Sequence, residues 1–484
     1  MPKGRSNGSG SLILVLAARY ALRYTLNVRV YLETLGCRLN YAEMSSLSRQ
    51  LIEAGHVIAS SADDAELCVL NSCAVTDEAV RKSRQLARHI ARVNPNARLV
   101  VTGCDATLEG EAVAALPNVA LVVSNRYKDE LLAMIRDRAA TLPGEAGALA
   151  GPSPSRDPSE DGVCALPVTG RTRAFVKVQD GCRNHCTFCI VRVARGAERS
   201  QPIGVVVDEV NRLHAEGYQE AVLTGVHLGG YGQDRGENLR SLLGALLQHS
   251  DMPRLRLSSL EPFDLSPDLF ELWTEWPHRL MPHLHLPAQS GSDAILRRMA
   301  RRNSVASFEG LAAAARAAIP GLMISTDLIA GFPGETEADF EETGAFAERV
   351  GFAHLHVFPY SARVGTPAAR FDGQVPEGIR RRRCQIFKEL DKKLGRLARA
   401  RLAGQTRSVL WESRAPRSEP GLDLRLDSRT LGNDGDTCWS GLTDNYVRVW
   451  APAPAGLDLH NHISDAKLLR NAGEGLLAEI VHRE

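Results

Sequence analysis

A regular alternation of strand-like and helix-like segments is the feature that most restricts what this chain can fold into. Four β-rich segments alternate with three helical ones near the start, at 28–36, 41–55, 65–73, 77–93, 97–104, 119–125 and 127–137. Parallel strands need a long crossover connection, which is usually a helix. The pattern therefore predicts a small parallel α/β domain.

A second series of the same kind begins after a break. Its β-rich segments lie at 174–179, 220–226, 254–260, 281–287, 323–331 and 353–361, with helical segments such as 292–302 and 336–350 between them. Six such units fall short of the eight of a complete barrel, so we predict an incomplete TIM-like barrel with its site at the carboxyl ends of the strands. Beyond residue 404, short β-rich stretches separated by turns predict a small all-β barrel.

A cysteine-rich loop directly follows the first strand of the predicted partial barrel. The segment "QDGCRNHCTFCIV" holds Cys182, Cys186 and Cys189. A structural zinc site takes four protein ligands, but no fourth thiol is near, and His185 is adjacent to Cys186, with its side chain expected to point away from the sulfurs. Three thiolates on one loop instead suit a 4Fe–4S cluster with one iron open to an exchangeable ligand. This open iron predicts chemistry at the loop.

Three more cysteines, Cys37, Cys73 and Cys104, lie at or just beyond the ends of strands in the first domain. The carboxyl ends of parallel strands share one edge of a sheet, where sites form. We therefore predict a second three-cysteine cluster. The alternative, that they are buried apolar fillers, does not explain why each follows a turn-forming residue. Cys68 lies in mid-strand and is interpreted as core.

Two segments have the composition of poorly structured chain. Residues 140–168 are rich in Pro, Gly and Ser and predict a flexible linker. Residues 1–27 include a basic start and a short apolar run, which resembles a signal peptide but is too short to span a membrane; we interpret them as a disordered extension. The chain has ten cysteines among 484 residues, with 44% apolar and 24% charged residues. This does not suggest a disulfide scaffold and favours a reducing, cytoplasmic location.

Candidate ligand contacts follow the fourth and fifth barrel strands. Gln289, Ser290 and Gly331 lie in "LPAQSGSD" and "GFPGET", where backbone can approach a nucleoside-like ligand closely. Each segment alone is also compatible with an ordinary tight turn.

A basic helix predicted at 379–401 is a candidate RNA contact. It carries ten Lys and Arg residues against Glu389 and Asp391. This excess predicts phosphate contact, although a charged helix face is often only solvated. The candidate residues are Arg380, Arg381, Arg382 and Arg383. The tail from residue 404 has nine basic and twelve acidic residues, so RNA contact there would depend on local residues such as Arg448 and Tyr446.

The order of these motifs resembles that of the radical-SAM methylthiotransferases. "TLGCRLNYAE", "NSCAVT", "VTGC" and "QDGCRNHCTFCIV" are similar to the family's motifs, and "HVFPYSARVGTPA" and "GLTDNYVRV" are similar to its MtaB branch. The resemblance implies an N-terminal methylthiotransferase domain at 28–139, a radical-SAM barrel at 169–403 and a TRAM-like domain at 404–484. One departure is "VRVARG", where the family's run of Pro-Tyr-Ala-Arg-Gly is expected; Arg192 replaces the proline.

The resemblance also implies an activity. The MtaB branch places a methylthio group on C2 of N6-threonylcarbamoyladenosine at tRNA position 37, using two S-adenosylmethionine molecules and two 4Fe–4S clusters. By this resemblance Cys182, Cys186 and Cys189 hold the radical-SAM cluster, and Cys37, Cys73 and Cys104 hold the auxiliary one. The hydrogen on adenine C2 is not acidic, so acid–base catalysis cannot replace this hydrogen with sulfur. A cofactor must carry out the step. Implied partners are tRNA, an electron donor and a sulfur source; we expect a monomer without membrane attachment.

Two alternatives stay open at this point. The same chemistry could act on isopentenyladenosine in tRNA or on a ribosomal-protein aspartate, the latter being disfavoured by the basic helix. A non-enzymatic iron–sulfur electron carrier or zinc-binding RNA module would not cleave S-adenosylmethionine.

Overall fold

The computed structural model describes residues 28–140, 172–415, 437–454 and 456–481. The predicted extension at 1–27 and nearly all of the predicted linker at 140–168 lie outside the described residues. Two compact units make up the described chain. Residues 28–36, 43–74 and 78–140 belong to the first, and residues 37–42, 75–77 and those from 172 onward belong to the second.

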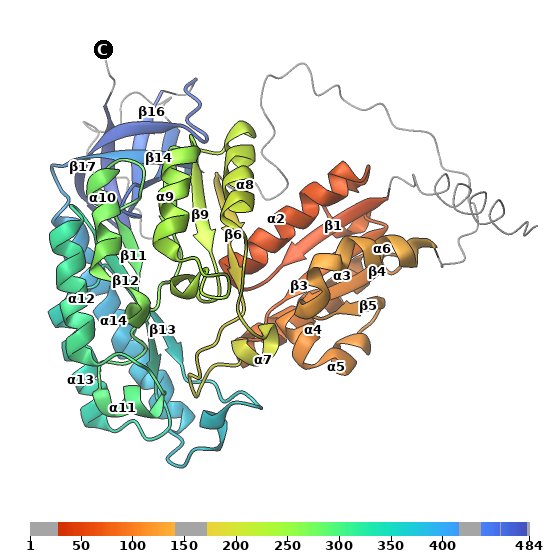
Figure 1. The fold of residues 1–484 in the computed structure, drawn as a ribbon, viewed down its shortest axis with the longest axis horizontal. Helices are drawn as coiled ribbons and strands as arrows, with labels where there is room; N and C mark the ends of the chain where they lie inside the picture. The colour runs from red at the N-terminus through yellow and green to blue at the C-terminus, as the bar shows by residue number, and fades with distance from the viewer. Residues whose placement is uncertain (1–27, 141–171, 416–436, 455, 482–484) are drawn as a thin grey trace, which may run out of the picture. The chain divides into compact units, whose positions relative to one another are not determined.

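The first unit is built on a five-stranded parallel sheet of order β2-β1-β3-β4-β5 (Figure 1). The strands are β1 (Arg29–Thr34), β2 (Val57–Ile58), β3 (Leu67–Ser72), β4 (Arg98–Gly103) and β5 (Val119–Val123). Its helices are α2 (Arg38–Glu53), α3 (Asp77–Val93), α4 (Cys104–Leu108), α5 (Gly110–Ala114) and α6 (Leu131–Ala140). The predicted parallel α/β fold is confirmed.

Both faces of this sheet are buried. Cys68 and Leu70 of β3 pack in one apolar cluster, and Val69 packs in another with Val100 of β4. A strand covered on both faces is apolar at successive positions instead of alternating. Cys68 is fully buried, as predicted.

The second unit contains the predicted partial barrel. Its strands are β6 (Arg173–Lys177), β9 (Glu220–Thr224), β10 (Arg254–Leu257), β11 (His283–His285), β12 (Met323–Ala330) and β13 (His354–Pro359). They form two parallel three-stranded sheets, and single bridges from Leu255 to Leu280 and from Ser259 to His285 connect these sheets. The resulting order is β6-β9-β10-β11-β12-β13.

Helices cover the outer side of these strands (Figure 1). They include α8 (Ile203–Ala215), α9 (Leu239–His249), α10 (Glu271–Glu275), α11 (Asp293–Arg298), α12 (Val305–Ala318) and α13 (Glu337–Val350). No helix among the described residues is long and apolar enough to cross a membrane.

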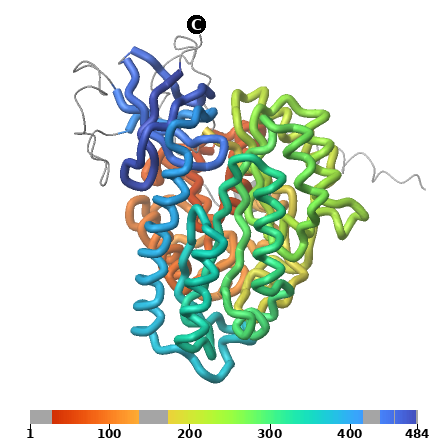
Figure 2. The backbone as a smooth tube through the Cα atoms, turned by 90° about the vertical axis from the view of Figure 1, so that its left-hand side faces the viewer, coloured from red at the N-terminus to blue at the C-terminus, as the bar shows by residue number. Residues whose placement is uncertain are grey.

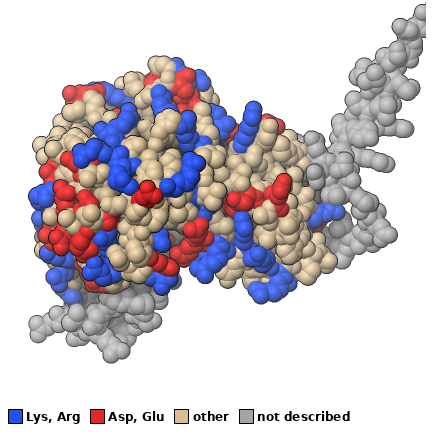
Figure 3. Space-filling view, turned by 90° about the horizontal axis from the view of Figure 1, so that it is seen from below, with Lys and Arg blue, Asp and Glu red and all other residues tan. Residues whose placement is uncertain are grey.

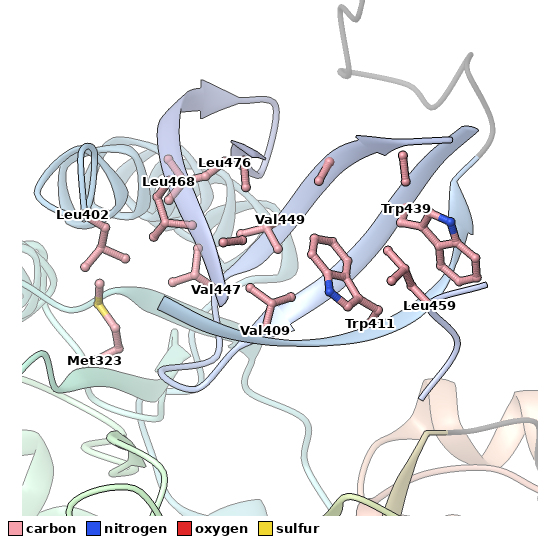
Figure 4. Close-up of a cluster of buried hydrophobic side chains, with 14 of the residues drawn as sticks. Met323, Leu402, Val409, Trp411, Trp439, Val447, Val449, Leu459, Leu468 and Leu476 are labelled. Atoms are coloured by element: carbon pink, nitrogen blue, oxygen red, sulfur yellow. The ribbon is translucent and has the colours of Figure 1, made fainter. Parts of the chain in front are cut away.

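A long helix, α14 (Glu377–Ala400), leads from the partial barrel to a closed β-barrel (Figure 2). The barrel strands are β14 (Thr406–Ala415), β15 (Thr437–Thr443), β16 (Arg448–Ala453), β17 (Ile463–Ala472) and β18 (Gly475–Ile480). Figure 4 shows its core, where Trp411, Val449 and Leu468 are buried. The predicted all-β domain is confirmed. The sequence did not reveal β15 and β17, because Ser, Gly, Asp and Lys give them low β propensity.

Buried charges fix this β-barrel to the amino-terminal ends of the partial-barrel strands. Glu220, the first residue of β9, is fully buried and accepts a hydrogen bond of 2.7 Å from Arg256. Burial opposes its ionisation, but the Arg256 charge lowers the pKa of Glu220 to about 2. Neighbouring Arg254 donates to Ser408 Oγ at 2.8 Å, and the ring of Tyr446 stacks on His283 at 4.6 Å. The carboxyl ends of the strands therefore stay available for a site.

Candidate active site

The cysteine loop lies where the partial-barrel fold places its site. It follows β7 (Gln179–Asp180), which continues from β6, and ends at α7 (Val191–Arg195). The loop begins with Gly181 at φ +73°, where a Cβ atom would lie only 2.0 Å from the Ala197 carbonyl oxygen. The backbone N–H of Cys182 donates to the Gly196 carbonyl at 3.1 Å. Only glycine permits this close approach at the start of the loop.

The three thiols of the loop fit a cluster held by three protein ligands. All nine described cysteines are free, and Cys182, Cys186 and Cys189 are partly buried. Burial raises the pKa of Cys182 to about 11 and of Cys189 to about 12. The metal-free thiols therefore keep their protons, and metal binding would release them. The Asn184 N–H lies 3.4 Å from the Cys182 sulfur, as suits a donor to a cluster ligand.

The two residues that precede Gly181 hold the loop in place. Asp180 Oδ1 accepts hydrogen bonds from the Gly181 N–H at 2.9 Å and from Arg195 at 3.0 Å. Gln179 donates to the Gly181 carbonyl at 2.8 Å and accepts from the His227 N–H at 2.8 Å. Both residues belong to the cysteine motif of the sequence, but neither was predicted to have a role. The sequence signal that could have indicated a role is the position of this polar pair directly before the loop that holds the three cysteines.

A histidine between two carboxylates lies beside the loop. His227 is 1% exposed, and its two ring nitrogens lie 2.5 Å from Glu198 Oε1 and Asp264 Oδ2. Burial opposes protonation, but the hydrogen bonds that the ring donates to the Asp264 and Glu198 carboxylates raise the pKa of His227. His227 and Glu198 also place ligand atoms within 4.8 Å of the Cys182 sulfur. Sequence reasoning missed this cluster, although His227 stands just after β9, a position that the fold marks as functional.

Arg301 reaches the same loop from the opposite half of the barrel. Its guanidinium bonds Glu261 at 2.6 Å and the Pro287 carbonyl at 2.6 Å, and it lies 3.9 Å from the Cys186 sulfur. Arg301 is buried. A buried cation beside a thiol favours the thiolate that a cluster needs.

The residues predicted to contact a nucleoside-like ligand occupy strained or packed positions. Gln289 is a non-glycine residue at φ +70°, a conformation that concentrates at functional sites. The Ser290 hydroxyl lies 3.2 Å from that of Thr343 in α13. Gly331 was predicted to let a ligand approach, but a Cβ there would lie 2.3 Å from Arg380 Cγ. The glycine thus makes room for a side chain of α14, and its ligand role stays a prediction.

Cysteines of the second set follow neighbouring strands of the first sheet. Cys73 directly follows β3, and Cys104 begins α4 directly after β4; Ser72 and Gly103 pair across the two strands. Both cysteines therefore lie at one edge and are buried. Cys37 comes three residues after β1, which pairs with the other side of β3, and is exposed.

Polar side chains of the first unit surround this edge. Ser83 Oγ accepts from the Cys73 N–H at 3.0 Å, and the Asn125 amide donates to the Cys104 sulfur at 3.6 Å. A donor to a ligand sulfur, such as the Asn125 amide, tunes an iron–sulfur cluster. Nearby, Lys128 pairs with Glu43 at 2.8 Å, and both are buried. None of these four residues was predicted, since they come from separate segments.

The predicted RNA contacts are mostly engaged within the protein. Arg380 bonds the Tyr360 carbonyl, Arg383 is buried against Glu335, and Arg448 pairs with Glu412. Of the four predicted arginines of the basic helix, Arg381 and Arg382 have the more exposed side chains, at 77% and 56%, although each pairs with a glutamate. On the face drawn in Figure 3, basic and acidic side chains are interspersed.

Arg192, which stands where the family's proline is expected, contacts a histidine of the cysteine loop. Arg192 Nη1 lies 3.1 Å from the Nε2 of His185 in the cysteine loop, and both side chains are exposed. The contact joins α7 to the loop that carries the three thiols.

Two family profiles match the chain. The one described as "Uncharacterized protein family UPF0004" matches residues 29–124, and the one described as "Radical SAM superfamily" matches residues 176–347. The fold is similar to that of the radical S-adenosylmethionine methyltransferase TsrM from Kitasatospora setae, with a TM-score of 0.50, 15% identity and 83% of each chain covered.

Curated relatives align over most of the chain. "Threonylcarbamoyladenosine tRNA methylthiotransferase MtaB" of Thermotoga maritima is 38% identical over 384 residues, which are 79% of this chain and 86% of that protein. The protein of the same name from Bacillus subtilis is 34% identical over 425 residues, 87% of this chain and 89% of that protein. "tRNA-2-methylthio-N(6)-dimethylallyladenosine synthase" of Cereibacter sphaeroides is 34% identical over 390 residues, 79% of this chain and 87% of that protein.

Proposed function

Because the chain belongs to the radical-SAM methylthiotransferase family, we propose that it places a methylthio group on C2 of N6-threonylcarbamoyladenosine at tRNA position 37. The observation that carries this proposal is the three-thiol loop at the carboxyl end of the first partial-barrel strand. The choice of substrate rests on the relatives named for threonylcarbamoyladenosine, of which the Thermotoga protein is 38% identical. The family consists of enzymes, so the electron-carrier and zinc-module alternatives are wrong.

The cysteines divide between two cofactors in this proposal. Membership of the radical-SAM superfamily implies S-adenosylmethionine and a 4Fe–4S cluster, which Cys182, Cys186 and Cys189 would hold. Cys37, Cys73 and Cys104 would hold a second one. When bound, these groups supply a radical that takes hydrogen from adenine C2 and the sulfur that replaces it.

The chain's own residues position and shield this chemistry. Asp180 and Gln179 fix the loop, and Arg301 places a positive charge beside Cys186. Gln289, Ser290 and Gly331 are proposed to contact S-adenosylmethionine. The burial of the loop cysteines limits access of water and oxygen to the cluster ligands.

Substrate binding is proposed to use exposed cations. Arg381 and Arg382 are the stronger candidates for phosphate contact, because Arg380, Arg383 and Arg448 are held by partners within the protein. Action on tRNA implies a cytoplasmic enzyme that needs an external electron donor and a sulfur source. We expect it to act as a monomer.

A second candidate substrate is dimethylallyladenosine in tRNA. Relatives named as synthases of its methylthio derivative are 34% to 35% identical to this chain. The two substrates differ in charge, because the threonylcarbamoyl group carries a carboxylate and the dimethylallyl group is apolar.

The experiment offers both tRNAs to one preparation. The anaerobically reconstituted protein is incubated with reductant, S-adenosylmethionine and either threonylcarbamoyl-modified or dimethylallyl-modified tRNA, and the digested nucleosides are analysed by mass spectrometry. We expect a methylthio product from the threonylcarbamoyl substrate only, and none from Cys182→Ala. A product from the dimethylallyl tRNA alone would overturn the substrate assignment but leave the reaction class intact.

A further inference from the structure

Two strands of the partial barrel begin with the same unusual triplet. β11 is His283–His285 and β13 starts at His354, so each carries the pattern His-Leu-His. β12 lies between them and pairs with both in parallel. Side chains two residues apart share a face of a strand. The pattern therefore brings four imidazoles onto one face of a three-stranded sheet.

Two residues of β12 on that face, Ser325 and Asp327, are polar as well. His283 Nε2 lies 3.1 Å from Ser325 Oγ, and His285 Nε2 lies 3.2 Å from Asp327 Oδ1. In the strand register, Asp327 is opposite His356 of β13. A carboxylate thus stands between an imidazole from each neighbouring strand.

Three of these side chains come close enough to share one ion. One ligand atom from each of His285, Asp327 and His356 lies within 4.8 Å of the other two. The rings of His285 and His356 are 5.2 Å apart and inclined at 64°. Two imidazoles and one carboxylate are the ligand set of three-ligand zinc and non-haem ferrous sites, which leave further coordination positions open.

A hydrogen bond directs one ligand toward the shared point. His285 Nδ1 lies 2.9 Å from Ser325 Oγ. This contact leaves Nε2 facing Asp327. Metal-bound histidines commonly use their second ring nitrogen in this way, which fixes the tautomer and the ring orientation. His285 is buried, so its ring has little freedom to turn away.

The shared point borders a cavity of about 810 Å³. Ser325 and His356 line this cavity together with Lys392 and Arg396 of α14 and Arg448 of the β-barrel. An ion held here would have a path from solvent and room for an oxygen ligand at its open positions. The cysteine loop does not contribute to the lining.

We propose that His285, Asp327 and His356 form a binding site for a divalent transition-metal ion of the zinc or ferrous class. The site is separate from the two cysteine sets. Because it needs none of their chemistry, the proposal does not depend on the proposed function. The competing account is that the three side chains form only a hydrogen-bonded His–Asp pair with a packed imidazole.

Zinc binding to the reconstituted protein tests the proposal. The anaerobic holoprotein is equilibrated with Zn²⁺, passed through a desalting column and analysed for zinc and iron by mass spectrometry. We expect about one zinc ion per chain, with the iron content unchanged. Asp327→Asn and His356→Ala should each weaken zinc binding about 100-fold or more, and Ser325→Ala about 10-fold to 100-fold.

Controls separate this site from the thiols and from surface histidines. His354→Ala removes an imidazole that pairs with Asp391 at 2.9 Å and is not one of the three ligands; it should keep its zinc. Cys182→Ser should keep it too. Asp327→Asn is nearly isosteric, and an unchanged circular dichroism spectrum and iron content would show that it folds. Ferrous occupancy is measured in the same variants by Mössbauer spectroscopy, as a mononuclear high-spin signal.

Two results would overturn the proposal. Zinc content that is equal in the wild type, Asp327→Asn and His356→Ala would place the ion elsewhere. Absence of both zinc and mononuclear ferrous ion from the wild type would leave only the hydrogen-bonded pair.

Discussion

The start of the cysteine loop offers a sharp test of how the backbone holds the thiols of Cys182, Cys186 and Cys189. Gly181 has φ +73°, and a Cβ added there would meet the Ala197 carbonyl oxygen at 2.0 Å and the Gly196 carbonyl oxygen at 2.8 Å. Gly196, in the same loop region, has φ +76°, and a Cβ added there meets nothing within 4 Å. Alanine at either position therefore has an unfavourable positive φ, but only Gly181→Ala also has a steric overlap.

The two contributions have different sizes. The positive φ costs an alanine roughly 1–3 kcal/mol in either variant. The overlap at residue 181 is with backbone, so relief requires moving the loop, at about 1–3 kcal/mol more. We therefore expect Gly181→Ala to lose about 2–6 kcal/mol of stability and Gly196→Ala about 1–3 kcal/mol.

The displaced loop should also lose its cluster. After anaerobic reconstitution, we expect about eight irons per chain in the wild type and in Gly196→Ala, and about four in Gly181→Ala, since the second cysteine set is untouched. Iron and sulfide analysis gives the content, and urea unfolding of the cluster-free proteins gives the stability. Equal iron contents in the two variants would refute the reasoning.

Three further predictions concern charge. Glu220→Gln leaves two arginines beside it without a buried counter-charge and should cost about 3–5 kcal/mol in urea unfolding, whereas Glu377→Gln at an exposed pair should cost less than about 1 kcal/mol. The raised folded-state pKa of His227 means that it stabilises the fold below its unfolded pKa of about 6.5 and that this contribution is lost as pH rises through the folded value. The urea midpoint of the cluster-free wild type should therefore fall between pH 6 and pH 9. The midpoint of the His227→Gln variant should fall less over the same range. Replacing Arg381 and Arg382 by alanine should weaken tRNA binding at low salt and reduce the salt slope by about 1 per lost phosphate contact; an unchanged slope would remove both residues from the interface.

The order of strands and helices was accessible from the sequence because each strand carries its own signal. Residues 67–70 and 99–101 are apolar at every position, as strands buried on both faces require, and Gly103 and Gly331 mark the ends of β4 and β12. The positions of Cys73 and Cys104 at one sheet edge followed from the parallel topology alone. In contrast, β15 and β17 of the small barrel carry weak local signals and are defined by their partners.

The side chains that complete the site depend on contacts between distant segments. Arg301 lies beside Cys186 although 115 residues separate them, and the ring nitrogens of His227 meet carboxylates from two other loops. No local pattern specifies such meetings. At Gly331 the sequence suggested a ligand contact, because a turn glycine lets a ligand approach closely. The packing of the Arg380 side chain against this glycine already accounts for the residue. Sequence patterns place residues at a site, but the packing around them decides what each one touches.

The most direct test of the whole account is iron content and S-adenosylmethionine cleavage in two cysteine variants. The wild type, Cys73→Ala and Cys182→Ala are reconstituted anaerobically, reduced with S-adenosylmethionine and tRNA, and assayed for iron, 5′-deoxyadenosine and methylthio nucleosides. The account predicts about eight irons in the wild type and about four in each variant. It predicts deoxyadenosine without methylthio product from Cys73→Ala, and neither from Cys182→Ala. Methylthio product from Cys73→Ala, or about four irons in the wild type, would contradict the account that two separate clusters carry out the reaction.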